Sequence, residues 1–330
     1  MPAVHLASNM HAAPSAESTA LRTLLRSLGQ IVLQPNACTG ACVLAALLVC
    51  DVRLACAALI GAVAANVSAI LAGCDEDDTR AGLHGFNGAL AGLAAFTFIA
   101  DVTTAIPVAI LAATATAWLL EPWSRWLGKQ GLGVYSSPCL MVTWAWLPSI
   151  RFAASAAHAS ATRAGFLVHT LQGTLAGIAQ TTFATGALSG LFVLAGIAAA
   201  SRRHAWWAFA GAGMASVGQV LLGAPLSSLQ AGMLGFNAAL TALAVADCGA
   251  LVILSAVALS VVLQQIAGYA GWPMMTAPFV VAVWGTRWGM DRFTSRFMGR
   301  RRQRTRDDVM TNATPDKPQA RPTPPATPAR

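Results

Sequence analysis

Long apolar stretches separated by short polar turns make up most of the chain. Several of these stretches reach or exceed the roughly 20 residues that a helix needs to cross the hydrocarbon core of a membrane. They cover residues 42–72, 86–120, 188–200, 206–222, 236–263 and 275–284. The pattern therefore predicts an all-α integral membrane protein that crosses a lipid bilayer several times.

The composition supports this prediction and limits the meaning of the net charge. Hydrophobic residues make up 56% of the 330 residues and charged residues only 10%, with a mean hydropathy of +0.59. An ordinary soluble domain carries about 25% charged residues. The formal net charge is +8, but many basic residues gather in "RFTSRFMGRRRQRTR" beyond the last apolar stretch. Such a flank is typical of a cytoplasmic segment that sets membrane orientation, so we expect no nucleic-acid partner.

Residues suited to catalysis or metal binding do not gather anywhere in the sequence. The seven cysteines lack the paired spacing of zinc sites and mostly lie inside apolar stretches, which predicts neither zinc nor disulfides. No carboxylate or amine lies at a predicted mid-membrane position, as coupling to an ion gradient normally requires. We therefore expect no enzyme, no cofactor and no metal. Four histidines at segment ends are expected to be solvated or interfacial: His84, His158, His169 and His204.

Three segments recur in the same order in the two halves of the chain. "GLHGFNGALAG" at residues 82–92 is followed 150 positions later by "GMLGFNAALTA", and "GQIVLQPNACTGA" at residues 29–41 is followed at the same offset by "AQTTFATGALSGL". "YSSPCLMVTW" at residues 135–144 matches "MTAPFVVAVW" at an offset of 140. Two homologous halves explain this order.

Each half is predicted to hold one half-length helix followed by about five hydrophobic segments. An odd number of crossings inserts the second half upside down, which gives an inverted repeat. The distribution of arginine and lysine favours two cytoplasmic termini, and the short turns and the N-terminal segment favour a bacterial inner membrane. The expected organisation is a disordered N-terminus, a first repeat, a linker, a second repeat and a basic, largely disordered tail, over residues 1–18, 19–150, 151–166, 167–290 and 291–330.

Matched glutamines are the first candidates for contact with a solute. Gln30 and Gln180 close the two short helices, and each is followed by a turn-like stretch. A helix that ends at mid-depth leaves backbone groups without partners, and irregular backbone at that depth survives only inside protein or along a wet cavity. The alternative is that both glutamines merely bridge neighbouring helices.

Matched hydroxyls and apolar side chains are the next candidates. Ser136 and Thr276 each stand two residues before a proline, which frees a carbonyl one turn earlier in a span. The alternative is that each hydroxyl bonds back to its own helix. Phenylalanine and leucine stand four residues apart in both halves, where they form either a flat slot or ordinary core: Phe86, Leu90, Phe236 and Leu240.

These motifs, in this order over residues 20–290, resemble the bacterial and animal urea transporters. The resemblance implies a channel of about ten transmembrane helices plus two half-spanning re-entrant helices. It also implies a homotrimer with a pore in each protomer and passive conduction of urea.

The resemblance also implies roles for particular residues. The amide or acid position of the family's half-helices falls on Gln30 and Gln180, and the aromatic position three residues later falls on Phe183. In the first half that position holds Leu33, a departure from the family. The central hydroxyls match Thr276 and, less closely, Ser136. The selectivity constriction matches Phe86, Leu90, Phe236 and Leu240. The alternative function that we keep is a channel for ammonia or another small neutral amide.

Overall fold

The computed structural model describes residues 16–150, 166–270 and 273–292. The contacts divide the chain into a first unit, residues 1–287, and a second unit, residues 288–330. Of the second unit only residues 288–292 are described; they are helical, and the Arg292 guanidinium lies 3.9 Å from the centre of the Trp288 ring. The predictions for the N-terminus, the inter-repeat linker with His158, and most of the tail fall outside the described residues.

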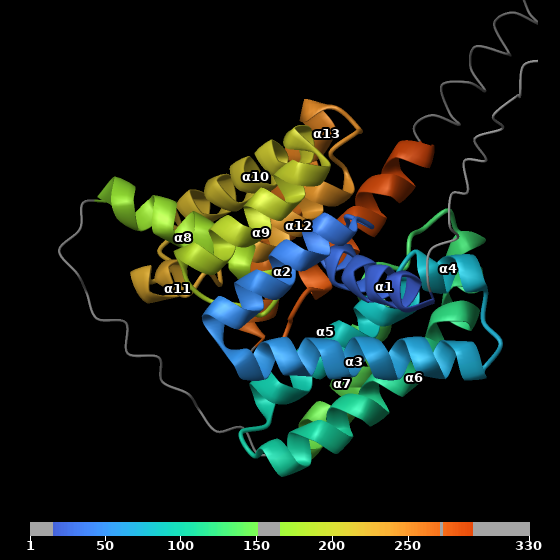
Figure 1. Ribbon diagram of the computed structural model, residues 1–330. Coiled ribbons are helices and arrows are strands. Elements are labelled where there is room, and N and C mark those ends of the chain that lie inside the picture. Colours follow the sequence, from blue (N-terminus) through green and yellow to red (C-terminus); the bar gives the residue numbers. More distant parts are fainter. Residues whose placement is uncertain (1–15, 151–165, 271–272, 293–330) are drawn as a thin grey trace, which may run out of the picture. The chain divides into compact units, whose positions relative to one another are not determined.

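The described part of the first unit is helical in both halves of the chain (Figure 1). The first half holds α1 Ala16–Gln30, α2 Ala37–Cys50, α3 Val52–Leu71, α4 Glu76–Arg80, α5 Leu83–Phe98, α6 Val102–Gly128, α7 Ser137–Trp146 and the 3₁₀ turn η1 Leu147–Ser149. The second half holds α8 Phe166–Gln180, α9 Ala187–Ala200, α10 Arg202–Leu221, α11 Leu226–Gln230, α12 Phe236–Ala244 and α13 Ala250–Tyr269, followed by helical residues 277–287.

The first four helices of the two halves match in order and in length. α1 and α8 have 15 residues each, α2 and α9 have 14, α3 and α10 have 20, and α4 and α11 have 5. Corresponding polar residues also cap corresponding helices. The Asp51 side chain accepts a hydrogen bond from the Arg53 N–H at the start of α3, and the Ser201 side chain accepts one from the His204 N–H at the start of α10. The duplicated sequence therefore builds duplicated local structure.

Two stretches that are continuous in hydropathy are each broken into two helices. Asp51, in extended conformation, separates α2 from α3, and Asp101 separates α5 from α6. The Asp101 carboxylate accepts hydrogen bonds from the N–H groups of Thr103 and Thr104, which satisfies donors that the first turn of a helix leaves unpaired. A short polar cap thus ends a helix inside a run that remains apolar on average.

Three of the described helices are long and apolar enough to cross a membrane, namely α3, α6 and α13. The ten crossings implied by the resemblance are not reached by this measure. The reason is local: α2 and α9 are apolar but have only 14 residues, and α10 has 20 residues but is not apolar enough.

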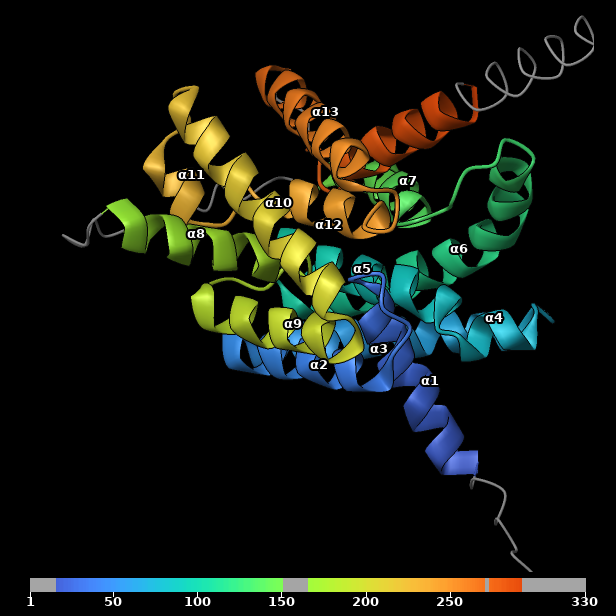
Figure 2. The ribbon, with the colours of Figure 1, turned by 90° about the horizontal axis from the view of Figure 1, so that it is seen from above.

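Small residues let the helices of the two halves approach closely. α2 and α9 lie side by side (Figure 2), and the Thr39 hydroxyl of α2 donates a 2.8 Å hydrogen bond to the Gly196 carbonyl of α9. The half-length helices pack on these two. A Cβ on Gly40 would lie 1.7 Å from the Leu25 carbonyl oxygen of α1, and a Cβ on Gly190 would lie 1.8 Å from the Leu175 carbonyl oxygen of α8. Only glycine fits at these crossings, which hold the ends of α1 and α8 in place.

Candidate functional site

α1 ends at Gln30 and α8 ends at Gln180, as the sequence predicts. The turn after each helix passes through a left-handed residue that is not glycine, Leu33 with φ +59° and Phe183 with φ +61°. Such residues are uncommon, and strained backbone concentrates where the surrounding structure enforces it. Both helix ends are therefore shaped by the same unusual turn.

Each glutamine donates one hydrogen bond to the segment that precedes the "GFN" motif of its own half. The Gln30 Nε2 lies 3.5 Å from the Ala81 carbonyl oxygen, and the Gln180 Nε2 lies 3.1 Å from the Ala231 carbonyl oxygen. Each glutamine thus bridges its own helix to a neighbouring segment, as the alternative interpretation expected. One such bond uses only part of what an amide offers, since it has two N–H donors and a carbonyl acceptor.

Each glutamine also lines a cavity, and the two cavities are built from corresponding residues. One has a volume of about 270 Å³ and is lined by, among others, Gln30, Leu33, Leu83, Phe86 and Tyr135. The other has a volume of about 680 Å³ and is lined by their counterparts Gln180, Phe183, Met233, Phe236 and Met275. The two cavities share no lining residue.

The walls of the two cavities differ in charge. Asp78 lines the smaller cavity, whereas none of the described residues that line the larger one is charged. The larger cavity instead has three further amides in its wall, Gln219, Gln264 and Gln265. The larger cavity is therefore polar without being charged.

Ser136 and Thr276 meet between the two halves of the chain. Their hydroxyl oxygens lie 2.8 Å apart, and the side chains are 5% and 7% exposed. Among the hydrogen bonds of the described residues, the two hydroxyls bond each other and not the backbone of their own helices. The back-bonding alternative therefore does not hold there. Thr276 lines the larger cavity, whereas Ser136 lines neither.

The proline argument for these hydroxyls is wrong. Pro138 lies in the first turn of α7, which begins at Ser137, and helical structure likewise begins at residue 277 just before Pro278. In the first turn the missing N–H of proline has no intrahelical partner to lose. No carbonyl is freed inside a span by these prolines. The irregular backbone lies instead before the helices, where Tyr135 has φ +48° and Met275 has φ +43°.

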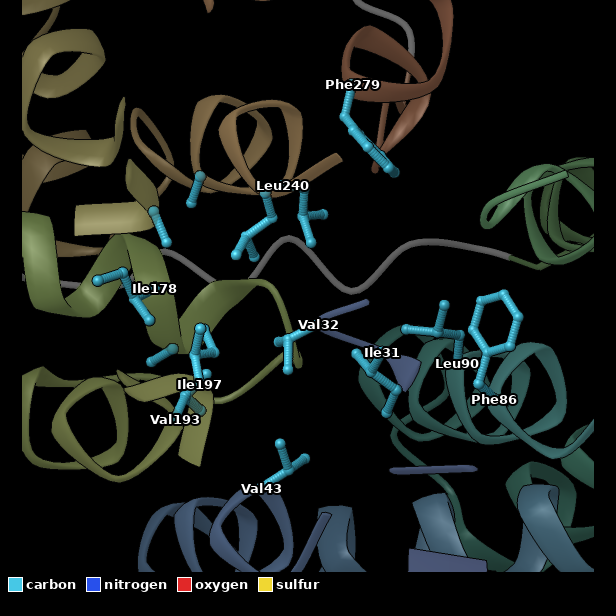
Figure 3. Close-up of a cluster of buried hydrophobic side chains, with 14 of the residues drawn as sticks. Ile31, Val32, Val43, Phe86, Leu90, Ile178, Val193, Ile197, Leu240 and Phe279 are labelled. Carbon is cyan, nitrogen blue, oxygen red and sulfur yellow. The ribbon is translucent and has the colours of Figure 1, made fainter. Parts of the chain in front are cut away.

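The four residues of the predicted constriction are all buried, but they do not all line the cavities. Phe86 lines the smaller cavity and Phe236 the larger, whereas Leu90 and Leu240 line neither and belong to the main apolar cluster. Phe86 and Leu90 extend from α5, and Leu240 extends from α12 (Figure 3). Spacing by four residues placed each pair on one helix, but it did not determine which member faces open space.

Asn87 and Asn237, the amides of the repeated "GFN" motif, are important residues that our sequence reasoning left out of the site. Both side chains are 0% exposed. Asn87 lies on α5 and Asn237 on α12, and each bonds the backbone on both sides of the hydroxyl residue, where the next helix begins. The signal was available, because a buried amide retained in both copies of an apolar motif needs hydrogen-bond partners.

The expectation that His84 is solvated or interfacial is also wrong. His84 is only 2% exposed, and its Nδ1 lies 3.2 Å from the Thr79 hydroxyl. His84 lies on α5, and its partner Thr79 lies on α4, which contacts α5. His169 and His204 are paired with glutamines, Gln230 and Gln34, at 3.2 Å and 3.0 Å.

The family described as urea transporter has a model that matches residues 21–288, which includes both repeated halves. A comparison with curated proteins found no match.

Proposed function

The chain belongs to the urea transporter family, a family of membrane transport proteins rather than enzymes, and from that premise we propose that it conducts urea passively through a narrow path in each protomer, neutral apart from Asp78 in the wall of the smaller cavity. The path runs from the cavity at Gln30, past the Ser136–Thr276 pair, to the cavity at Gln180. The hydroxyl pair carries the proposal, because it joins the two halves at a buried point through a 2.8 Å hydrogen bond.

The chemistry of the lining suits urea. Urea is planar and neutral, with one carbonyl acceptor and four N–H donors, and removing its water costs several kcal/mol unless other partners replace that water. Gln30 and Gln180 offer both donors and acceptors, and the two hydroxyls offer the same at the midpoint. These neutral groups also bind weakly enough for the solute to leave, which conduction requires.

The apolar side chains supply size and shape selection in this proposal. Phe86 lines the smaller cavity and Phe236 the larger, and Leu90 and Leu240 belong to the buried apolar cluster. A flat solute passes edgewise between aromatic faces, and a hydrated ion finds no charge at the hydroxyl pair or in the described wall of the larger cavity to replace its water. At the turns after α1 and α8 only the larger cavity has an aromatic side chain, because the counterpart of Phe183 in the smaller cavity is Leu33.

The membrane arrangement that we propose is an inverted repeat with ten crossings and two re-entrant half-helices. The matched helix lengths, the matched turns after Gln30 and Gln180 and the positive-inside distribution support it. The resemblance further supports a homotrimer. The short turns support a bacterial inner membrane, and the distribution of arginine and lysine supports two cytoplasmic termini.

The test is uptake of labelled urea by proteoliposomes that contain the purified protein. Passive conduction predicts uptake that stops at equal concentrations inside and outside, with or without a sodium or proton gradient. Uptake above that level would refute a passive path. Competition by methylurea, formamide and ammonia identifies the solute: if ammonia or formamide permeates well and urea does not, the alternative of a channel for ammonia or another small amide is correct.

A further inference from the structure

We propose that Asn87 and Asn237 are positioning residues that hold the Ser136–Thr276 hydroxyl pair in place. Each asparagine would cap the helix that begins just after the hydroxyl residue, although the asparagine itself lies on a different helix. The inference rests on the proposed function, because the hydroxyl pair matters for flux only if it lies on the conduction path.

In the first half Asn87 bonds the backbone on both sides of Ser136. Its Nδ2 donates to the Tyr135 carbonyl at 3.3 Å, and its Oδ1 accepts from the Cys139 N–H at 3.2 Å. Ser136 itself occupies the N-cap position of α7 but makes no side-chain capping bond. The first N–H groups of a helix lack intrahelical partners, so an amide from α5 does what the cap side chain normally does. The Ser136 hydroxyl is thereby left for Thr276.

In the second half Asn237 repeats this arrangement around Thr276. Its Nδ2 donates to the Met275 carbonyl at 3.2 Å, and its Oδ1 accepts from the Phe279 N–H at 3.3 Å. The bonded positions correspond to those of the first half at the same offset of 140 residues. An arrangement that recurs in both halves, with both amides fully buried, is a common feature of the repeat.

Only a neutral amide meets both demands of this position. The backbone carbonyl needs a donor and the backbone N–H needs an acceptor, and asparagine presents both on one short side chain. An ionised aspartate has acceptors only and would place a charge in a buried site. Leucine has the same number of side-chain heavy atoms and satisfies neither group.

Backbone strain explains why such bracing is needed. Tyr135 and Met275 hold left-handed φ values of +48° and +43° immediately before the two hydroxyl residues. Non-glycine residues keep this conformation only where surrounding contacts enforce it. Each asparagine bonds the carbonyl of the strained residue, so its loss should release the turn and let the hydroxyl move.

In the second half the bracing continues to the wall of the larger cavity. The Asn237 Nδ2 also lies 3.2 Å from the Gln264 Oε1, and the Gln264 Nε2 donates to the Met233 carbonyl at 2.7 Å. Gln264 and Met233 both line that cavity. The Thr276 side is therefore held by more bonds than the Ser136 side, and we expect Asn87 variants to loosen the pair more readily.

The experiment compares Asn87→Leu and Asn237→Leu with Asn66→Leu. Asn66 is a matched control, because it is a buried amide of α3 whose 3.3 Å hydrogen bond goes to the Ser27 hydroxyl and not to the backbone beside Ser136 or Thr276. We expect the two test variants to lower urea permeability by about tenfold, equivalent to about 1.4 kcal/mol in barrier height, and to change the ratio of urea to methylurea flux. Asn66→Leu should keep that ratio even where it lowers thermal stability.

A second measurement reports the geometry without any solute. Ser136→Cys combined with Thr276→Cys places two sulfurs where hydroxyl oxygens lie 2.8 Å apart, close enough for a disulfide on mild oxidation. Peptide mass spectrometry then measures the 136–276 cross-link in each background. We expect a high yield in the parent and with Asn66→Leu, and a reduced yield with Asn87→Leu or Asn237→Leu. Where a leucine variant does not assemble, Asn→Ser at the same position replaces it.

The outcomes separate the two proposals. Parental flux ratio and parental cross-linking in the Asn87 and Asn237 variants would overturn the positioning role. A parent protein that conducts no urea would overturn the proposed function, while the cross-linking would still decide whether the asparagines hold the pair.

Discussion

Thr276→Val removes one hydroxyl from the centre of the proposed path and leaves its shape nearly unchanged. The variant loses the 2.8 Å hydrogen bond to Ser136 and leaves that buried hydroxyl without its partner. A neutral hydrogen bond contributes about 1 kcal/mol net, and an unpaired buried group costs about 1–3 kcal/mol. A urea molecule at the midpoint loses the same partner, so we expect its barrier to rise by about 1.4 kcal/mol and its permeability to fall about tenfold.

The assay is stopped-flow light scattering of proteoliposomes under an inward urea gradient, at equal protein content. Thr116→Val is the matched control, since Thr116 is fully buried in α6 and its hydroxyl donates to the Ala113 carbonyl of its own helix at 2.7 Å. The control should conduct as the parent does. Equal urea permeability in Thr276→Val and Thr116→Val would refute the role of the hydroxyl pair.

Two further substitutions test selection and packing. Phe236→Ala removes an aromatic wall of the larger cavity and should raise the flux of bulkier amides relative to urea; unchanged selectivity would assign the ring to core packing alone. Gly190→Ala places a Cβ 1.8 Å from the Leu175 carbonyl oxygen and should lower stability by at least about 2 kcal/mol, whereas Gly218→Ala meets nothing within 4 Å and should be neutral or slightly stabilising. Thermal unfolding in detergent compares the two glycine variants, and equal stability would contradict the close crossing of α8 and α9.

The duplication and the ends of the half-helices could be predicted because they are local in sequence. A repeated motif at a constant offset is visible without any contact information, and a glutamine before a turn-like stretch marks a helix end. The same repetition drew attention to Ser136 and Thr276, whose hydroxyl oxygens lie 2.8 Å apart, although the proline argument attached to them was wrong. What the two hydroxyls do depends on residues 140 positions apart, which spacing alone does not bring together.

Features that depend on tertiary packing could not be predicted in this way. Average hydropathy hid the caps at Asp51 and Asp101, because one polar residue hardly changes a long apolar window. Helical spacing grouped Phe86 with Leu90 but did not show that only the phenylalanine reaches a cavity. The role of Asn87 depends on a helix that starts about fifty residues later, so its partners were not visible in the motif.

The central claim is that two repeat-related half-sites, each built around a neutral glutamine, form one path for urea. Stopped-flow urea permeability of the purified parent and of the double variant Gln30→Leu/Gln180→Leu tests this claim most directly, with assembly of both checked by size-exclusion chromatography. The account predicts that the parent raises urea permeability well above protein-free liposomes and that the assembled double variant falls to that background. A double variant that conducts urea as fast as the parent would contradict the account.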